Sequence, residues 1–136
     1  ADILLKAKEC FNNLDVQDEY CPEMPGLWGM INPPGSRNNV HTHPYNYISG
    51  VYYLKVPSKS GNLVFLEPKP QAEVLSPPKK KDASIHLAHS VSWEPKENSL
   101  IFFPSWLQHE VQLNNSNQDR VILSFNINWR HENADS

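Results

Sequence analysis

The distribution of proline most constrains what this chain can fold into. Twelve of the 136 residues are proline, and they are spread from Pro22 to Pro104. Their share is roughly twice the ~5% of an average protein. Because proline lacks a backbone N–H and interrupts helix interiors and central strands, the sequence predicts short strands joined by many turns.

The size and charge of the chain fit one globular domain. Its 136 residues fall within the usual ~100–200 for a domain, and 39% are hydrophobic while 20% are charged. A net charge of -3 argues against a nucleic-acid partner and leaves small molecules and proteins. No apolar run reaches the ~18 residues of a membrane span, no leader opens the chain, and two cysteines are too few for a disulfide framework. We therefore expect a cytoplasmic protein with no membrane contact.

Hydrophobic periodicity divides the chain into one helix and a series of strands. Apolar residues recur at helical spacing within about 1–13. The tract Cys21–Gly26 has the composition of a turn. Strand patterns follow, at Leu27–Ile31, Tyr47–Val56, Gly61–Glu67, Ser99–Phe103, Glu110–Leu113 and Val121–Trp129.

These segments predict a single all-β domain over residues 1–136 with a few flanking helices. Its helix covers about 1–13 and its β core about 27–129, and the stretch of about 71–92, which has no clear period, is expected to be a long loop. A helix followed by six or so short strands is typical of a barrel or sandwich. Exposed strand edges in such a fold could pair in a homodimer.

The histidines carry the clearest chemical signal. His41 and His43 form an H-x-H pair beside a predicted strand. Residues i and i+2 of an extended chain point to the same side, so both imidazoles can reach one metal ion. His109, in a distant strand segment, is the natural third ligand. Each histidine taken alone fits an ordinary surface position equally well.

Four sequence blocks together resemble the Fe(II)/2-oxoglutarate-dependent oxygenases, and most of all their small, prolyl-hydroxylase-like branch in bacteria and phages. The blocks are NPPGSRNNVHTHPYNYISGVYYLKVP, GNLVFLEP, LIFFPSWLQHEVQ and RVILSFNI, and they span about Leu27 to Trp129. The resemblance implies a double-stranded β-helix, also called a jelly roll, of cupin-like type. It also implies Fe(II) as cofactor and 2-oxoglutarate as co-substrate. A small-molecule or peptidyl substrate would be hydroxylated by O2 with release of succinate and carbon dioxide.

The resemblance assigns the metal ligands. Such enzymes hold iron with an H-x-D/E pair and a distal histidine. His41 matches the first histidine and His109 the distal one, but His43 stands where the family has Asp or Glu. Since imidazole also binds iron, we expect His43 to be the third ligand. The alternative is that His43 faces the site without binding and that water completes the coordination.

The resemblance also assigns the residues that bind 2-oxoglutarate. Arg120, eleven residues after His109, matches the arginine that binds the far carboxylate, to which a guanidinium can donate two parallel hydrogen bonds. Tyr53 matches a position that contacts the same carboxylate, and Asn32 lies near another co-substrate contact. Ser124 has the same strand parity as Arg120 and is expected to line the site.

Two other interpretations stay open. Gly35 with the H-x-H pair, and the spacing from Pro104 to His109, fit parts of the cupin pattern, although the cupin glutamate is missing. The chain would then be a metal-binding cupin of other chemistry. A non-catalytic β-sandwich binding module is the second alternative, and in it the histidines would not converge.

Overall fold

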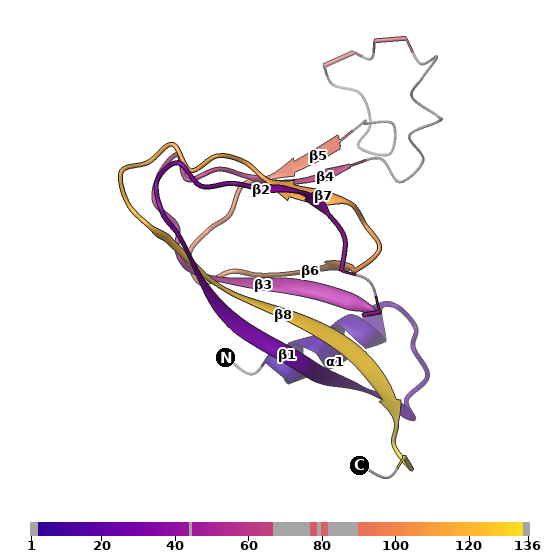
Figure 1. Ribbon diagram of the computed structural model, residues 1–136. Helices are drawn as coiled ribbons and strands as arrows, with labels where there is room; N and C mark the ends of the chain where they lie inside the picture. The colour runs from indigo at the N-terminus through magenta and orange to yellow at the C-terminus, as the bar shows by residue number, and fades with distance from the viewer. Residues whose placement is uncertain (1–2, 44, 67–76, 79, 82–89, 135–136) are drawn as a thin grey trace.

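The structure is a computed structural model that describes residues 3–43, 45–66, 77–78, 80–81 and 90–134 (Figure 1). These residues form helix α1 and eight strands. The helix spans Ile3–Asn13, and the strands are β1 (Tyr20–Asn32), β2 (Asn38–His41), β3 (Ile48–Lys55), β4 (Leu63–Leu66), β5 (Ser90–Trp93), β6 (Leu100–Pro104), β7 (His109–Val111) and β8 (Arg120–His131).

The strands form two antiparallel sheets. The major sheet has the order β1-β8-β3-β6, and the minor sheet has the order β2-β7-β4-β5. Every paired neighbour runs antiparallel. In Figure 1 the two sheets form separate layers, and α1 lies against the major sheet on the side away from the minor sheet. This two-layer arrangement is the double-stranded β-helix that the family resemblance implies.

Helix α1 covers the outer face of the major sheet. Its buried residues, Ala7 and Phe11, are each 1% exposed and pack against Ile48, Phe125 and Ile127. Alternate residues of a strand point to opposite faces. The residues between those that meet the helix therefore face the minor sheet, where the candidate site lies.

The turn predicted at Cys21–Gly26 is wrong, because this tract is the first half of β1. β1 is an edge strand, where a missing N–H can face away from the neighbouring strand, so Pro22 and Pro25 are tolerated. A register shift between Glu23 and Gly26 takes up one extra residue, as in a β-bulge. The turn-like composition thus reflects an irregular sheet edge.

The long loop predicted at 71–92 is wrong at its end. Ser90–Trp93 forms β5 and pairs with β4, and a strand of four residues gives too short a pattern to detect. Most of the remaining loop, at 71–76, 79 and 82–89, lies outside the described residues. The sheets also extend beyond the predicted core of 27–129, since β1 begins at Tyr20 and β8 ends at His131.

Two further observations concern the whole described chain. The one helix of the described residues, α1, is not long and apolar enough to cross a bilayer. Cys10 and Cys21 are free thiols. Burial raises the pKa of Cys10, which keeps this side chain in its unreactive protonated form.

Candidate active site

A cavity of about 480 Å³ lies between the two sheets. Strands of both sheets contribute to its lining. Most of the residues from β3 and β8 alternate along their strands, as expected for one face of a sheet. They are Ser49, Val51 and Tyr53 from β3 and Arg120, Ile122 and Ser124 from β8, and the neighbouring pair Gly50 and Phe125 also borders the cavity.

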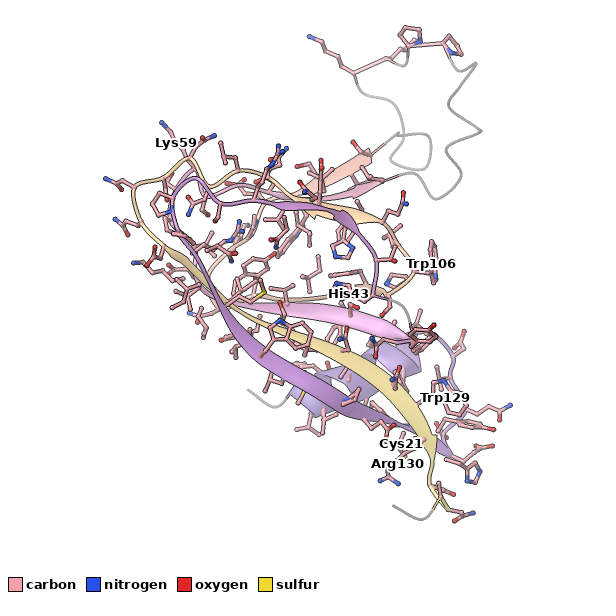
Figure 2. All side chains as sticks on the ribbon, in the orientation of Figure 1. Cys21, His43, Lys59, Trp106, Trp129 and Arg130 are labelled. Atoms are coloured by element: carbon pink, nitrogen blue, oxygen red, sulfur yellow. The ribbon has the colours of Figure 1, made fainter. Side chains whose placement is uncertain are left out.

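Two of the three candidate metal ligands meet at this cavity. The Nε2 atoms of His43 and His109 lie 3.2 Å apart. Their rings stack with centroids 5.1 Å apart and planes inclined by 15°. His109 begins β7, and His43 follows β2, which pairs with β7. In Figure 2, His43 lies between the two layers of strands, on the side away from Lys59.

The backbone fixes the tautomer of His109. Its Nδ1 atom lies 2.9 Å from the carbonyl oxygen of Leu107. Since a carbonyl oxygen only accepts, Nδ1 carries the proton and donates it. The Nε2 atom then keeps its lone pair, and that lone pair is on the side of His43. Metal-binding histidines are held in the same way, with the second ring nitrogen donating to a carbonyl or carboxylate.

The spacing of the two nitrogens fits one metal ion. Imidazole nitrogens bind an ion such as zinc at about 2.0–2.1 Å, so two of them on one ion lie roughly 3.0–3.4 Å apart. The observed 3.2 Å is within this range. The side chain of His41 is not described, but its backbone is paired with His109 in the register of β2 and β7. Among the side chains that are described, no group of three His, Cys, Asp or Glu residues could hold a metal ion.

Arg120 places a buried cation on the same cavity. It is 1% exposed, and its Nη1 donates to the carbonyl of Ser60 at 2.8 Å. Its Nε has no hydrogen-bond partner among the described residues. Burial lowers the pKa of Arg120, but a guanidinium stays charged at neutral pH. A buried donor without a partner is costly, so an anion in the cavity would be bound favourably.

Tyr53 adds a neutral donor near this cation. The residue is 4% exposed, and Trp93 packs against its ring with centroids 5.4 Å apart. Burial raises the pKa of Tyr53 to about 12, although the charge of Arg120 opposes the shift. The phenol therefore keeps its proton at neutral pH and can donate it. A guanidinium and a hydroxyl donor together suit a carboxylate.

The other two predicted co-substrate residues differ in position. Ser124 lines the cavity, and its Oγ lies 3.7 Å from the sulfur of Met30. Asn32 is opposite Arg120 in the register of β1 and β8, and its Nδ2 has no partner among the described residues. Asn32 is 6% exposed but is not one of the residues that line the cavity. The structure thus brings Ser124 to the cavity and Asn32 beside the arginine.

Sequence reasoning missed several residues around the cavity. Trp28 and Met30 of β1 line the cavity. They are spaced by two and four residues from Asn32, so the alternation of an extended strand places all three on the same face and could have identified them. Ser105, in the turn after β6, is fully buried. Serine is common in exposed turns, so no local signal distinguishes this one.

Comparison with known proteins identifies the family. Residues 26–126, which are 101 of the 136, match the profile of the family described as "Putative 2OG-Fe(II) oxygenase". A comparison with curated protein sequences gives no match.

Solved structures share the fold. A prolyl-4-hydroxylase of Pseudomonas putida is 19% identical, with a TM-score of 0.60, over 92% of this chain and 62% of that one. A 2OG-Fe(II) oxygenase family oxidoreductase of Burkholderia pseudomallei is 14% identical, with a TM-score of 0.63, over 88% and 50%. HygX of Streptomyces hygroscopicus, solved with nickel and 2-oxoglutarate, is 12% identical, with a TM-score of 0.60, over 93% and 65%.

The two kinds of comparison carry different weight. At 12–19% identity the structural likeness shows the fold alone, and the chain spans 50–65% of the length of these three proteins. The family profile covers most of the chain, including the H-x-H pair, His109 and Arg120. The chain therefore belongs to the family of 2OG-Fe(II) oxygenases, whose cofactor is Fe(II) and whose co-substrate is 2-oxoglutarate.

Proposed function

We propose that this protein is an Fe(II)- and 2-oxoglutarate-dependent oxygenase that hydroxylates a small-molecule or peptidyl substrate. One observation carries the proposal. A single cavity is lined by the histidine pair, His43 and His109, and by the buried guanidinium of Arg120. This combination suits a dicarboxylate that binds a metal ion at one end and a cation at the other.

Three histidines would hold the metal. The Nε2 atoms of His43 and His109 lie 3.2 Å apart, and the backbone of His41 is paired with His109. Because His43 replaces a carboxylate, the site has one negative charge fewer than an H-x-D/E site. Bound Fe(II) would supply the oxidising chemistry in which O2 and 2-oxoglutarate give succinate, carbon dioxide and a hydroxylated substrate.

The protein's own groups would bind and orient the co-substrate. Arg120 would donate from Nε to the far carboxylate, and the neutral hydroxyl of Tyr53 would add a second donor. The apolar side chains of Leu63, Phe103 and Ile122 line the same cavity and exclude water. In such surroundings the attraction between the guanidinium and a carboxylate is stronger than in water.

Anaerobic absorption spectroscopy tests this proposal. Fe(II) and 2-oxoglutarate are added separately and together to the metal-free protein under nitrogen. We expect a visible charge-transfer band that requires both additions. Arg120→Ala should lose the band at concentrations that saturate the wild type, because the far carboxylate loses its cation. Arg130→Ala is the matched control, since Arg130 is an exposed arginine on the same strand.

Other outcomes would favour the alternatives. Metal binding without a response to 2-oxoglutarate would indicate a cupin of other chemistry, and no metal binding would indicate a non-catalytic binding module. The variant His43→Ala addresses the ligand set. Loss of the band in this variant would support a three-histidine site, and an unchanged band would show that His43 is not a ligand.

A further inference from the structure

The turn between β6 and β7, at 104–107, holds both histidines of the pair through its backbone. The carbonyl of Ser105 accepts a hydrogen bond from the backbone N–H of His43 at 3.0 Å. The carbonyl of Leu107 accepts the hydrogen bond from Nδ1 of His109 at 2.9 Å. One short turn thus sets the relative position of two side chains that are 66 residues apart.

A chain of side-chain hydrogen bonds, buried at its two serines, ties this turn to the major sheet. The hydroxyl oxygens of Ser49 and Ser105 lie 2.8 Å apart, and Ser49 donates to Oδ1 of Asn126 at 3.0 Å. A serine hydroxyl has one hydrogen. Since Ser49 donates its hydrogen to Asn126, Ser105 must donate to Ser49. The chain therefore runs in one direction, from the turn through β3 to β8.

The burial of these hydroxyls indicates that they have a specific role. Ser105 is 0% exposed and Ser49 is 2% exposed. Burying a hydroxyl costs free energy unless it is hydrogen-bonded, and an apolar side chain of similar size would avoid that cost. The backbone N–H of Ser105 also donates to the carbonyl of Tyr47 at 3.1 Å, so the turn is anchored to the start of β3 as well. A shift of the turn would move both histidine-holding carbonyls together.

We infer that Ser49 and Ser105 are positioning residues that keep Nε2 of His43 and Nε2 of His109 at metal-binding distance. The inference rests on the proposed metal site. The two hydroxyls act through the turn backbone, so their removal should weaken metal binding more than it disturbs the fold. Outer-shell substitutions at metal sites typically lower the affinity about 10–100-fold.

A cobalt titration tests the inference without any turnover. Co(II) alone is added to the metal-free protein, and its visible d–d absorption reports both affinity and ligand geometry. We expect Ser49→Ala and Ser105→Ala each to weaken Co(II) binding about 10-fold and to change the absorption band. Ser49→Thr keeps the hydroxyl and should recover most of the affinity.

The matched control is Ser92→Ala. Ser92, on β5, accepts a hydrogen bond at 3.0 Å from Nδ2 of Asn62, the residue before β4, and it does not line the cavity. Its substitution removes one serine hydrogen bond elsewhere in the molecule. We expect its Co(II) affinity to equal that of the wild type.

The outcomes separate this inference from the proposed function. Failure of the wild type to bind Co(II) would contradict the metal site itself. If both alanine variants bind Co(II) as tightly as the wild type, the positioning role is wrong. The same holds if the variants have a lower melting temperature but an unchanged Co(II) affinity. If Ser105→Ala does not fold, Ser49→Ala decides the question, because it breaks the same chain and leaves the turn sequence intact.

Discussion

Arg120 and Tyr53 are two buried polar side chains that line the same cavity. The guanidinium donates from Nη1 to the carbonyl of Ser60, and its Nε has no hydrogen-bond partner among the described residues. Among the described residues no carboxylate forms an ion pair with Arg120. The local charge is therefore available for an anionic ligand that enters the cavity.

Substitution of Arg120 by lysine should separate co-substrate binding from metal binding. Lysine keeps the charge but loses the planar set of donors that matches a carboxylate. We expect the affinity of Co(II)-loaded Arg120→Lys for 2-oxoglutarate to fall about 10–100-fold while Co(II) affinity stays unchanged, as measured by calorimetry. Arg130→Lys serves as the control. Equal 2-oxoglutarate affinity in wild type and Arg120→Lys would contradict the assigned role.

Tyr53 should make folding stability depend on alkaline pH. Its pKa is raised to about 12 in the folded protein, against about 10 in an unfolded chain. The unfolded state therefore loses this proton first, so the stability that Tyr53 contributes is complete below about pH 10 and is lost as the pH rises toward 12. Urea unfolding at pH 9 and pH 11 measures how far the free energy of unfolding falls between the two pH values. This fall should be roughly 1–2 kcal/mol smaller in Tyr53→Phe than in the wild type. Identical decreases would show that Tyr53 has an ordinary pKa.

The sequence predicts site residues through local spacing and through the family resemblance. The H-x-H spacing predicts His43, the resemblance predicts Arg120 and Tyr53, and strand parity with Arg120 predicts Ser124. Ser105 could not be found in this way, because its burial depends on β3 and β8 lying against the turn. The side chain of His41 lies outside the described residues, so its assignment as a ligand remains a prediction.

At the scale of elements, β3 and β8 approach each other closely at one point. The ring of Phe125 lies where a side chain at Gly50 would be, and the carbonyl oxygen of Ile101 on β6 would be 2.9 Å from an added Cβ. Gly50 is therefore required by packing. Its lack of a side chain lets Phe125 reach the core under α1.

The substitution Gly50→Ala should destabilise the fold. The added methyl group must displace a buried aromatic ring and a strand backbone, and overpacking of this kind typically costs about 1–3 kcal/mol. Urea unfolding would measure the loss. Gly29→Ala is the matched control, since its Cβ would meet only Leu123 Cδ2 at 3.8 Å. Equal stability of the two variants would argue against the close packing at Gly50.

The elements predicted best from sequence are the long strands with many β-branched and aromatic residues. β3 and β8 have eight and twelve residues; β8 is predicted from its alternation, and β3 from its content of β-branched and aromatic residues. The first half of β1 was predicted as a turn because it contains prolines. A strand tolerates prolines only at the edge of a sheet, and a local sequence pattern does not reveal which strands lie at the edge. β5 has four residues and gives no pattern that can be told from a loop.

At the scale of the whole molecule, the cavity depends on both sheets. Its histidine pair is joined to the minor sheet through β7, while Arg120 and Tyr53 belong to the major sheet. A ligand that binds all of them can bind only the folded protein. Ligand binding should therefore raise the stability of the molecule as a unit.

Thermal unfolding should reveal this linkage. A ligand at 100 times its dissociation constant stabilises the folded state by about 2.7 kcal/mol. We expect Co(II) to raise the melting temperature and 2-oxoglutarate to raise it further. In Arg120→Lys the first increase should remain and the second should shrink. Absence of any shift at saturating concentrations would contradict a ligand site between the sheets.

The pairing of β1 with β8 has a consequence for biosynthesis. β8, the last strand of the described chain, lies between β1 and β3 and bonds to both. During translation β1 and β3 therefore leave the ribosome long before the strand that joins them. The nascent chain must keep two incomplete strand edges soluble until β8 emerges, and such edges are prone to aggregate. The yield of folded protein should therefore depend on chaperone supply, and a stop codon that removes β8 should leave both strand edges unpaired.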